Sequence, residues 1–317
     1  MSRLLRWMIL FVLVGAALSL GCMIWSGWDE VTRALARLSI LLLGGSAVVA
    51  SLAYVIRFVR WHLALQCLGH RVPHRINLAI YLSGLALTTS PGKLGETIRS
   101  VFLRPLGVPV AKSLGAFLAD RLSDVLGVCL LGAIAGWLAR GSLNIAGLAL
   151  GGVLAGSFAF RCLVRIPPMF DRAMAIASRW GLAPGRVAVE ALAHWAQIWT
   201  LRNATLFALI ASLAYGIQAA VFTALCNSLS LSVQPAVALE TFVNATLFGA
   251  ATMVPGGLGT MEASLVFQLM GHGIQKADAV AIAIATRCVT LWCGVFIGLI
   301  AFSGVCLRAE PSGPSSA

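Results

Sequence analysis

Charged side chains are scarce in this chain of 317 residues: they make up 11% of it, against about 25% in a soluble domain. Hydrophobic residues make up 59%, against about 45–50% in a soluble domain. A water-soluble fold of this length has no place for so much apolar surface, whereas a bilayer does. The same apolar content excludes a disordered protein. The composition therefore predicts an integral membrane protein.

Lysine is almost missing from the basic residues, which comprise twenty Arg and three Lys against eleven carboxylates. The net charge of +12 does not indicate nucleic-acid binding, because the basic residues stand between apolar runs and form no single patch. In a multi-pass membrane protein, an excess of this kind marks the cytoplasmic segments. We therefore expect membrane lipids as partners and no nucleic acid.

Motifs for metals and cofactors are absent from the sequence. The eight Cys are scattered, mostly within apolar runs, with no C-x-x-C and no His/Cys zinc spacing. They are predicted to be small core residues. The segment Ser90–Thr97 contains Gly-Lys but lacks the spacing of a nucleotide-binding loop and follows no strand. We expect no disulfide framework, no metal and no cofactor.

Long apolar runs predict an all-α, polytopic helical bundle with about six full crossings, since a hydrocarbon core of about 30 Å takes about 20 residues. The predicted spans are Trp7–Trp25, Ser39–Phe58, Ser113–Leu138, Leu143–Phe160, Thr205–Leu229 and Ala277–Leu307. The amphipathic segment Trp28–Leu38 is too short to cross and is predicted to lie at the interface. The basic stretch from Arg57 to Arg75, with its three histidines, is predicted to be a solvated loop.

Two further apolar stretches are interrupted by Pro-Gly. The predicted helix pairs are Ile76–Thr89 with Leu94–Leu103, and Ala236–Met253 with Leu258–Gly271. The helix-breaking residues are Pro91, Gly92, Pro255, Gly256 and Gly257. A full crossing by the first pair would put the basic region 161–202 outside, against the positive-inside rule. Both pairs are therefore predicted to be re-entrant, with both termini cytoplasmic and 308–317 a flexible tail.

The two breaks resemble each other in sequence. Pro91-Gly-Lys-Leu-Gly95 matches Pro255-Gly-Gly-Leu-Gly259, 164 residues later. Over the longer segments 91–112 and 255–276, seven of 22 positions are identical. Three predicted crossings separate the copies, so the second copy is inverted relative to the first. Inverted repeats with helices broken at midplane are typical of secondary transporters.

The repeat divides a single transmembrane domain, 1–317, into two broken-helix units. The first unit is predicted at 76–138 and the second at 236–307. A shift of two residues aligns Arg121 with Arg287 in the span that follows each break. Arg287 has no acidic residue within four positions, so it needs either a distant carboxylate or an anionic ligand.

Ionisable residues within a bilayer cost roughly 2.5–3.5 kcal/mol each on insertion scales, so they indicate a partner or a function. The helix N-termini near the two breaks also offer free donors to a phosphate or carboxylate. The residues predicted to contact substrate are Lys93, Gly95, Glu96, Arg99, Asp120, Arg121, Asp124, Gly259, Glu262 and Arg287. The three arginines are predicted for phosphate and the two glutamates for a cationic group or a coupling proton. The structural alternatives are local pairing of Arg121 with Asp124 and dipole complementation by the glutamates.

These motifs resemble those of a known family. They are Ser90-Pro-Gly-Lys-Leu-Gly-Glu96 with Arg99, Asp120-Arg-Leu-Ser-Asp124, Pro255-Gly-Gly-Leu-Gly-x-x-Glu262, and Arg287. In the same order, and over nearly the whole chain, they resemble the lysylphosphatidylglycerol synthase transmembrane family, also called flippase-like. Thr260-Met261 departs from relatives that carry Arg beside the Glu. The resemblance implies a multi-pass protein of the bacterial inner membrane, and we expect a stand-alone member without the aminoacyl-transferase domain.

The function expected from the repeat, the buried charges and the resemblance is transport, not catalysis. We expect a flippase that moves an amphiphilic lipid between leaflets: a phospholipid, a polyprenyl-phosphate-linked lipid or a hopanoid type. One alternative is an integral-membrane glycosyl- or acyl-transferase, although no Asp-x-Asp donor site or Ser/His/Asp pattern stands out. Another is a scaffold that binds enzymes of lipid biosynthesis.

Overall fold

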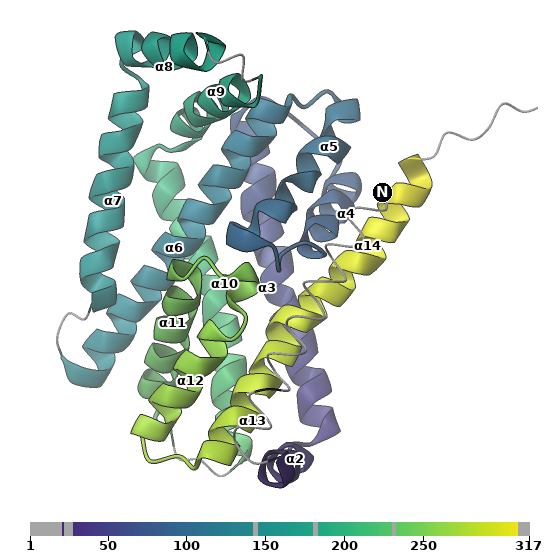
Figure 1. Cartoon of the computed structure of the whole chain (residues 1–317), viewed down its shortest axis with the longest axis vertical. Coiled ribbons are helices and arrows are strands. Elements are labelled where there is room, and N and C mark those ends of the chain that lie inside the picture. The colour runs from purple at the N-terminus through teal and green to yellow at the C-terminus, as the bar shows by residue number, and fades with distance from the viewer. Residues whose placement is uncertain (1–20, 22–27, 142–144, 180–182, 230–232, 310–317) are drawn as a thin grey trace, which may run out of the picture.

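The computed structural model describes residues 21, 28–141, 145–179, 183–229 and 233–309, and within them the chain contains helices and no strand (Figure 1). The predicted all-α membrane protein is confirmed. Four segments of this part are long and apolar enough to cross a bilayer: Ile40–Cys67, Ile145–Val164, Leu201–Ser228 and Lys276–Leu307. The predicted first span, Trp7–Trp25, lies outside the described residues apart from Gly21, as does most of the predicted tail 308–317.

The described helices follow one another in this order: α2 (Trp28–Ala36), α3 (Ile40–Cys67), α4 (His74–Leu85), η1 (Pro91–Ile98), α5 (Arg99–Leu103), η2 (Arg104–Leu106), α6 (Val110–Arg140), α7 (Ile145–Val164), α8 (Pro167–Arg179), α9 (Ala183–Ile198), α10 (Leu201–Ser228), α11 (Pro235–Ala251), η3 (Pro255–Gly257), α12 (Thr260–Gly271), α13 (Lys276–Arg287), η4 (Cys288–Trp292) and α14 (Cys293–Ala309).

Helix α6 is the central element, packed against α7, α9, α10 and α11. It begins after Pro109 and ends at Gly141, whose left-handed φ of 66° stops the helix. Its 31 residues extend about 46 Å at 1.5 Å per residue, enough to cross a bilayer. It contains the predicted span Ser113–Leu138 and carries Asp120, Arg121 and Asp124 near its middle.

Helix α3 overturns one prediction. It continues past Phe58 to Cys67, so the first part of the expected solvated loop is a buried helix. Arg57 and Arg60 are 6% and 1% exposed, and His62 is buried as well. The prediction was wrong because these polar side chains find partners on other helices, which removes the need for water.

The two predicted breaks are present, and they meet. Helix α4 has 12 residues and extends about 18 Å, less than the 30 Å or so of a hydrocarbon core. The expected helix Leu94–Leu103 is instead a 3-10 segment as far as Ile98, followed by the five residues of α5. Segment η1 packs against η3, and a Cβ on Gly256 would lie 3.2 Å from Thr89 Cα.

The order of elements recurs along the chain. Helices α2, α3 and α4, then η1, α5 and α6, correspond in order to α9, α10 and α11, then η3, α12 and α13–α14. Helices α3 and α10 both have 28 residues. The packing exchanges partners between the two runs, because α6 contacts α9 and α11 whereas α13 contacts α2 and α14 contacts α4. Helices α2 and α9 lie at opposite ends of the molecule (Figure 1).

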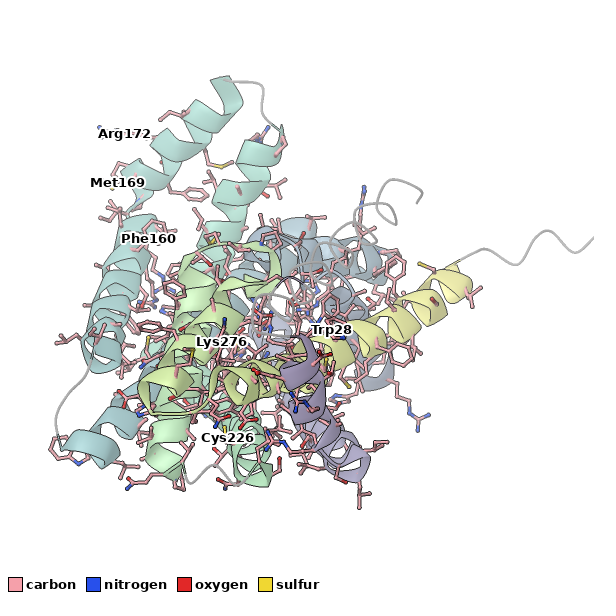
Figure 2. All side chains as sticks on the ribbon, turned by 60° about the horizontal axis from the view of Figure 1, so that its bottom comes forward. Trp28, Phe160, Met169, Arg172, Cys226 and Lys276 are labelled. Carbon is pink, nitrogen blue, oxygen red and sulfur yellow. The ribbon has the colours of Figure 1, made fainter. Side chains whose placement is uncertain are left out.

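The outer helices show where the ends of the molecule lie. In Figure 2, Trp28 on α2 and Lys276 at the start of α13 lie at the end turned forward, whereas Arg172 on α8 lies at the other end. Helix α7 faces outward, since only 6% of its most apolar stretch is buried. It therefore presents an apolar surface that suits lipid.

Candidate functional site

Two acidic residues on α6 hold an arginine from α3. Arg60 donates from Nε to Asp120 Oδ1 at 2.7 Å and from Nη2 to Asp124 Oδ1 at 2.8 Å. Asp120 and Asp124 are four residues apart and so lie on the same face of the helix. All three side chains are buried. This contact joins α3 to α6 across 60 residues of sequence.

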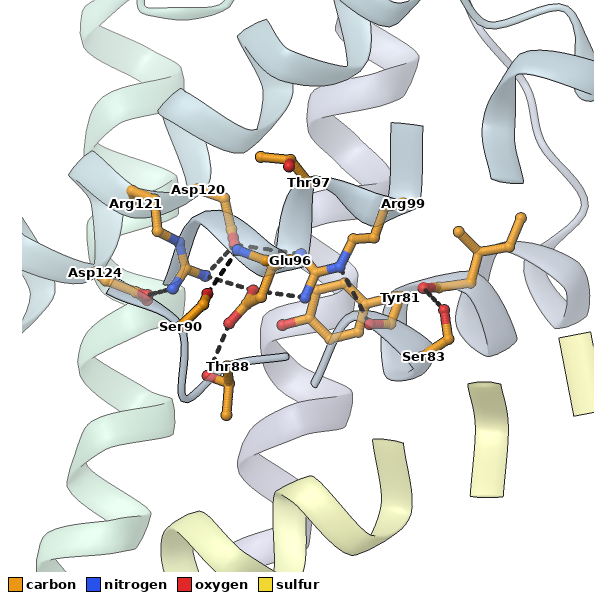
Figure 3. A network of polar contacts seen from close by, with 12 residues as sticks. Tyr81, Ser83, Thr88, Ser90, Glu96, Thr97, Arg99, Asp120, Arg121 and Asp124 are labelled. Atoms are coloured by element: carbon orange, nitrogen blue, oxygen red, sulfur yellow. Dashed lines mark hydrogen bonds and ion pairs between the residues drawn. The ribbon is translucent and has the colours of Figure 1, made fainter. Parts of the chain in front are cut away.

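Arg121 lies at the centre of a wider network (Figure 3). Its Nη2 contacts Asp120 Oδ2 at 2.6 Å and Glu96 Oε2 at 3.5 Å, and its Nη1 lies 3.3 Å from Asp124 Oδ2. The local pairing of Arg121 with Asp124 is therefore present, together with a contact to the break. The Arg121 side chain is 19% exposed, more than the carboxylates that it contacts.

Glu96 in η1 anchors the first break to the turn that follows α4 and to α5. Its Oε1 accepts a hydrogen bond from Thr88 at 2.9 Å, and its Oε2 accepts one from Arg99 Nη2 at 2.7 Å. The Arg99 guanidinium lies 4.1 Å from the centre of the Tyr81 ring and 5.1 Å from that of Trp61. Arg99 is fully buried, at 0% exposure. These contacts fix Glu96 in place.

The backbone of the first break is tightly packed. Gly95 donates its N–H to Ser90 Oγ at 2.6 Å, and a Cβ there would lie 2.6 Å from Leu87 Cβ. Lys93 has a left-handed φ of 57°, an uncommon conformation for a residue with a side chain. The predicted α-helical N-terminus near Gly95 is therefore replaced by a 3-10 turn.

The second break is built around Arg287. This residue donates from Nε to Glu262 Oε1 at 2.8 Å and from Nη2 to the Gly256 carbonyl at 2.6 Å. Its Nη1 lies 3.3 Å from the sulfur of Met261. Gly259, with a φ of 78°, precedes α12, whose first turn contains Glu262. The distant carboxylate that Arg287 needs is thus Glu262, 25 residues away.

A cavity of about 320 Å³ lies between the two breaks. This volume is within the usual range for small-molecule sites. Of the predicted site residues, five line it directly: Lys93, Glu96, Arg121, Asp124 and Arg287. The other five support the lining from behind through the contacts above or through the backbone: Gly95, Arg99, Asp120, Gly259 and Glu262.

Arg57 and Arg60 are the site residues that the sequence interpretation missed. Arg57 lines the cavity and donates from Nη2 to Gln218 Oε1 at 3.1 Å. The apolar residues that follow, among them Trp61, Ala64 and Leu65, continue the helical face of α3. That continuation was the available signal that the basic stretch is helical. Among the described residues, no three His, Cys, Asp or Glu side chains are arranged to hold a metal.

Comparison with known families decides the affiliation of the chain. A family model described as the lysylphosphatidylglycerol synthase TM region matches residues 12–298. The chain belongs to this family. The match confirms the resemblance carried by the break motifs, and it indicates a lipid-related function in a membrane. No curated protein sequence matches the chain.

Proposed function

We propose that this member of the lysylphosphatidylglycerol synthase transmembrane family moves an amphiphilic lipid between leaflets. The headgroup occupies the cavity between the two breaks, and the tails stay in the bilayer. The observation that carries this proposal is a charged cavity located where two broken segments, η1 and η3, meet. It rests on the affiliation, the cavity and the buried charges together.

The free-energy cost of irregular backbone and buried charges within a membrane supports a polar path through this cavity. Irregular backbone at membrane depth is tolerated where it is buried in protein or lines a wet cavity. Buried charges in a membrane are expensive and accompany substrate or ion pathways. Met253 lines the cavity and is itself 62% exposed, so the cavity wall reaches the protein surface there. The exposed Phe248, on α11 shortly before Met253, adds apolar surface for lipid tails.

The recurring element order supports an inverted repeat with units at 76–138 and 236–307. In transporters built this way, one repeat rocks against the other around a site near the bilayer midplane. The two breaks contact each other at the cavity, so such a movement would alter access to it. We assign the cations of the cavity wall, among them Arg121 and Arg287, to the phosphate side, and Glu96 and Glu262 to a cationic group or a coupling proton.

The location we propose is a bacterial inner membrane with both termini in the cytoplasm. Exposed basic residues gather in the loop after α3 and in η2, α8 and α9, among them Arg71, Arg104, Arg172 and Arg186. The positive-inside rule places these segments on the cytoplasmic side. The lipids of that membrane are the expected partners.

A lipid comparison tests the proposal in three strains: a deletion strain, its parent, and one carrying E96Q/E262Q. Total lipid composition and leaflet distribution are measured together, the latter with a membrane-impermeant label. We expect unchanged totals and one lipid stranded in the inner leaflet of the deletion strain. A lipid that disappears from the total while its precursor accumulates would overturn transport in favour of a transferase.

A further inference from the structure

The wall of the cavity carries more cations than carboxylates. The lining cations are Arg57, Lys93, Arg121 and Arg287. The lining carboxylates are Glu96 and Asp124. The charged residues that contact these six add two of each sign: Arg60, Arg99, Asp120 and Glu262. The excess is two positive charges by either count. An excess of cations around a cavity favours an anion inside it, because uncompensated charge away from water is costly.

Two of the lining cations form ion pairs with carboxylates, and the other two form none among the described residues. Arg121 contacts Glu96, Asp120 and Asp124, and Arg287 contacts Glu262. Arg57 is only 6% exposed, yet no carboxylate in the described part of the chain lies within ion-pair distance of it. Its other contacts are neutral. They are a hydrogen bond to Gln218 and a position 4.2 Å from the centre of the Tyr215 ring.

Arg57 also has an unsatisfied hydrogen-bond donor. Its Nε is buried and has no hydrogen-bond partner among the described residues. Guanidinium groups suit phosphate because their donors form a planar fork. Buried polar groups are nearly always satisfied, so a donor left over on a cavity wall indicates a missing acceptor.

Lys93 is the second cation without a carboxylate. Among the described residues, none forms an ion pair or hydrogen bond with its ammonium group. Its φ is 57°, and the matching position of the second break is Gly257, whose φ is 63°. Glycine adopts this conformation without strain, whereas lysine does so at a cost. A strained residue that lines a cavity indicates that its side chain is needed there.

We propose that Arg57 and Lys93 form an anion site that binds the phosphate of a lipid headgroup. This deepens the proposed function and rests on it. Both side chains donate charge-assisted hydrogen bonds, which are roughly twice as strong as neutral ones. A phosphate between them supplies an acceptor to Arg57 Nε and offsets the excess charge. The substrate class is thus an anionic phospholipid or a lipid phosphate, not a neutral lipid.

A pair of probes that differ by the phosphate tests the site. The purified full chain in nanodiscs is titrated with phosphatidylglycerol and with diacylglycerol bearing the same tails, and binding is measured by native mass spectrometry. We expect phosphatidylglycerol to bind at least tenfold more tightly. R57Q and K93G should each weaken it by about tenfold and leave diacylglycerol unchanged, since each removes one charge-assisted contact. R104Q is the matched control, because Arg104 is exposed and lies outside the cavity.

Folding is controlled separately. K93G relieves the positive φ at that position, so its melting temperature should not fall below that of the parent chain. R57K keeps the charge and should restore part of the binding lost in R57Q. Equal loss of both probes in R57Q and K93G would overturn the site. Equal affinity of the parent chain for both probes would do the same.

Two further experiments distinguish lipid-borne from free phosphate, and failure of the site from failure of the proposed transport. Inorganic phosphate that binds as tightly as phosphatidylglycerol would overturn a lipid-borne source. The same proteins are then placed in liposomes, and movement of labelled phosphatidylglycerol between leaflets is measured. Binding that depends on Arg57 without any movement would overturn transport and uphold the site. Movement that is unchanged in R57Q/K93G would overturn the site and uphold transport.

Discussion

Glu262 and Arg287 form a 2.8 Å ion pair across 25 residues of sequence, and Glu96 and Arg121 form a 3.5 Å pair across the same separation. In both cases a glutamate just after a Pro-Gly break contacts an arginine on the long helical segment that follows. The two breaks therefore share an ion pair as well as a sequence pattern. The pairs differ in their surroundings, because Arg121 has further carboxylates and Arg287 has none among the described residues.

The pair at the second break is expected to dominate the stability of that unit. Both side chains are at most 8% exposed, so R287Q would leave Glu262 as an unpaired buried carboxylate. Breaking a buried pair from one side costs about 3–5 kcal/mol. We expect a melting temperature at least ~6 °C lower, at roughly 2 °C per kcal/mol. E262Q should cost less, because Arg287 keeps its bond to the Gly256 carbonyl.

The control for this pair is the double variant E262Q/R287Q, in which no charge is left unpaired. Its stability should recover to above that of R287Q. Purely additive losses in the double variant would contradict a direct coupling between the two side chains.

Arg57 and Arg60 lie one helical turn apart on α3, yet their replacement by Gln is expected to affect the melting temperature differently. Arg60 contacts Asp120 and Asp124, so R60Q leaves two carboxylates without their shared cation. We expect a loss of about 3–5 kcal/mol and a melting temperature at least ~6 °C lower. R57Q removes a buried cation that has no carboxylate within ion-pair distance among the described residues, so its melting temperature should change by less than ~2 °C.

Thermal unfolding in detergent, followed by tryptophan fluorescence and size exclusion, compares the two variants directly. The substitution is the same, the helix is the same and both side chains are buried. The difference therefore isolates the carboxylate partners. A melting temperature that falls equally in R57Q and R60Q would mean that Arg57 has a structural partner and is not held for a ligand.

Helix α14 approaches α4 so closely that a methyl group cannot fit. A Cβ on Gly298 would lie 2.7 Å from the carbonyl carbon of Leu85 and 2.9 Å from Ala86 Cα, both of which are backbone atoms. We expect G298A to cost about 1–3 kcal/mol, as overpacking does. Gly304 is the matched control in the same helix, because a Cβ there meets nothing within 4 Å. G304A should be neutral or stabilise by up to about 1 kcal/mol through helix propensity. A stable G298A would show that α4 can shift away from α14.

Uninterrupted apolar runs allowed two of the long helices to be predicted from sequence. The expected Leu143–Phe160 and Thr205–Leu229 agree with α7 and α10 to within four residues at each end. Hydropathy suffices there because each run is apolar throughout, whether the helix faces outward, as α7 does, or is half buried, as α10 is. It failed at α3, where Arg57 and Arg60 look like loop residues although the helix continues as far as Cys67 and buries both arginines.

Most of the residues of the candidate site could be predicted from the sequence, but their contacts between helices could not. The Pro-Gly breaks and the charges inside spans are visible as patterns in the sequence. The contact of Arg60 with Asp120 joins residues 60 positions apart on different helices, which leaves no spacing to recognise. The expected α-helix after Gly95 also failed, because the close approach to Leu87 and Ser90 favours a tighter 3-10 turn.

The two ends of the molecule should lie on opposite sides of the membrane. Arg71 lies in the loop after α3 and Asp171 lies in α8, whereas Arg33 in α2 and His272 after α12 lie at the other end (Figure 1). Single cysteines at these four exposed positions, in a background without the native cysteines, are treated with a membrane-impermeant maleimide on intact cells. We expect R33C and H272C to react, and R71C and D171C to react only after permeabilisation.

Because the basic excess of α8 and α9 requires the cytoplasmic side, labelling of D171C on intact cells would reverse the orientation. Labelling of R71C and D171C on different sides would instead mean that α4 and α5 cross fully, which would overturn the re-entrant pair.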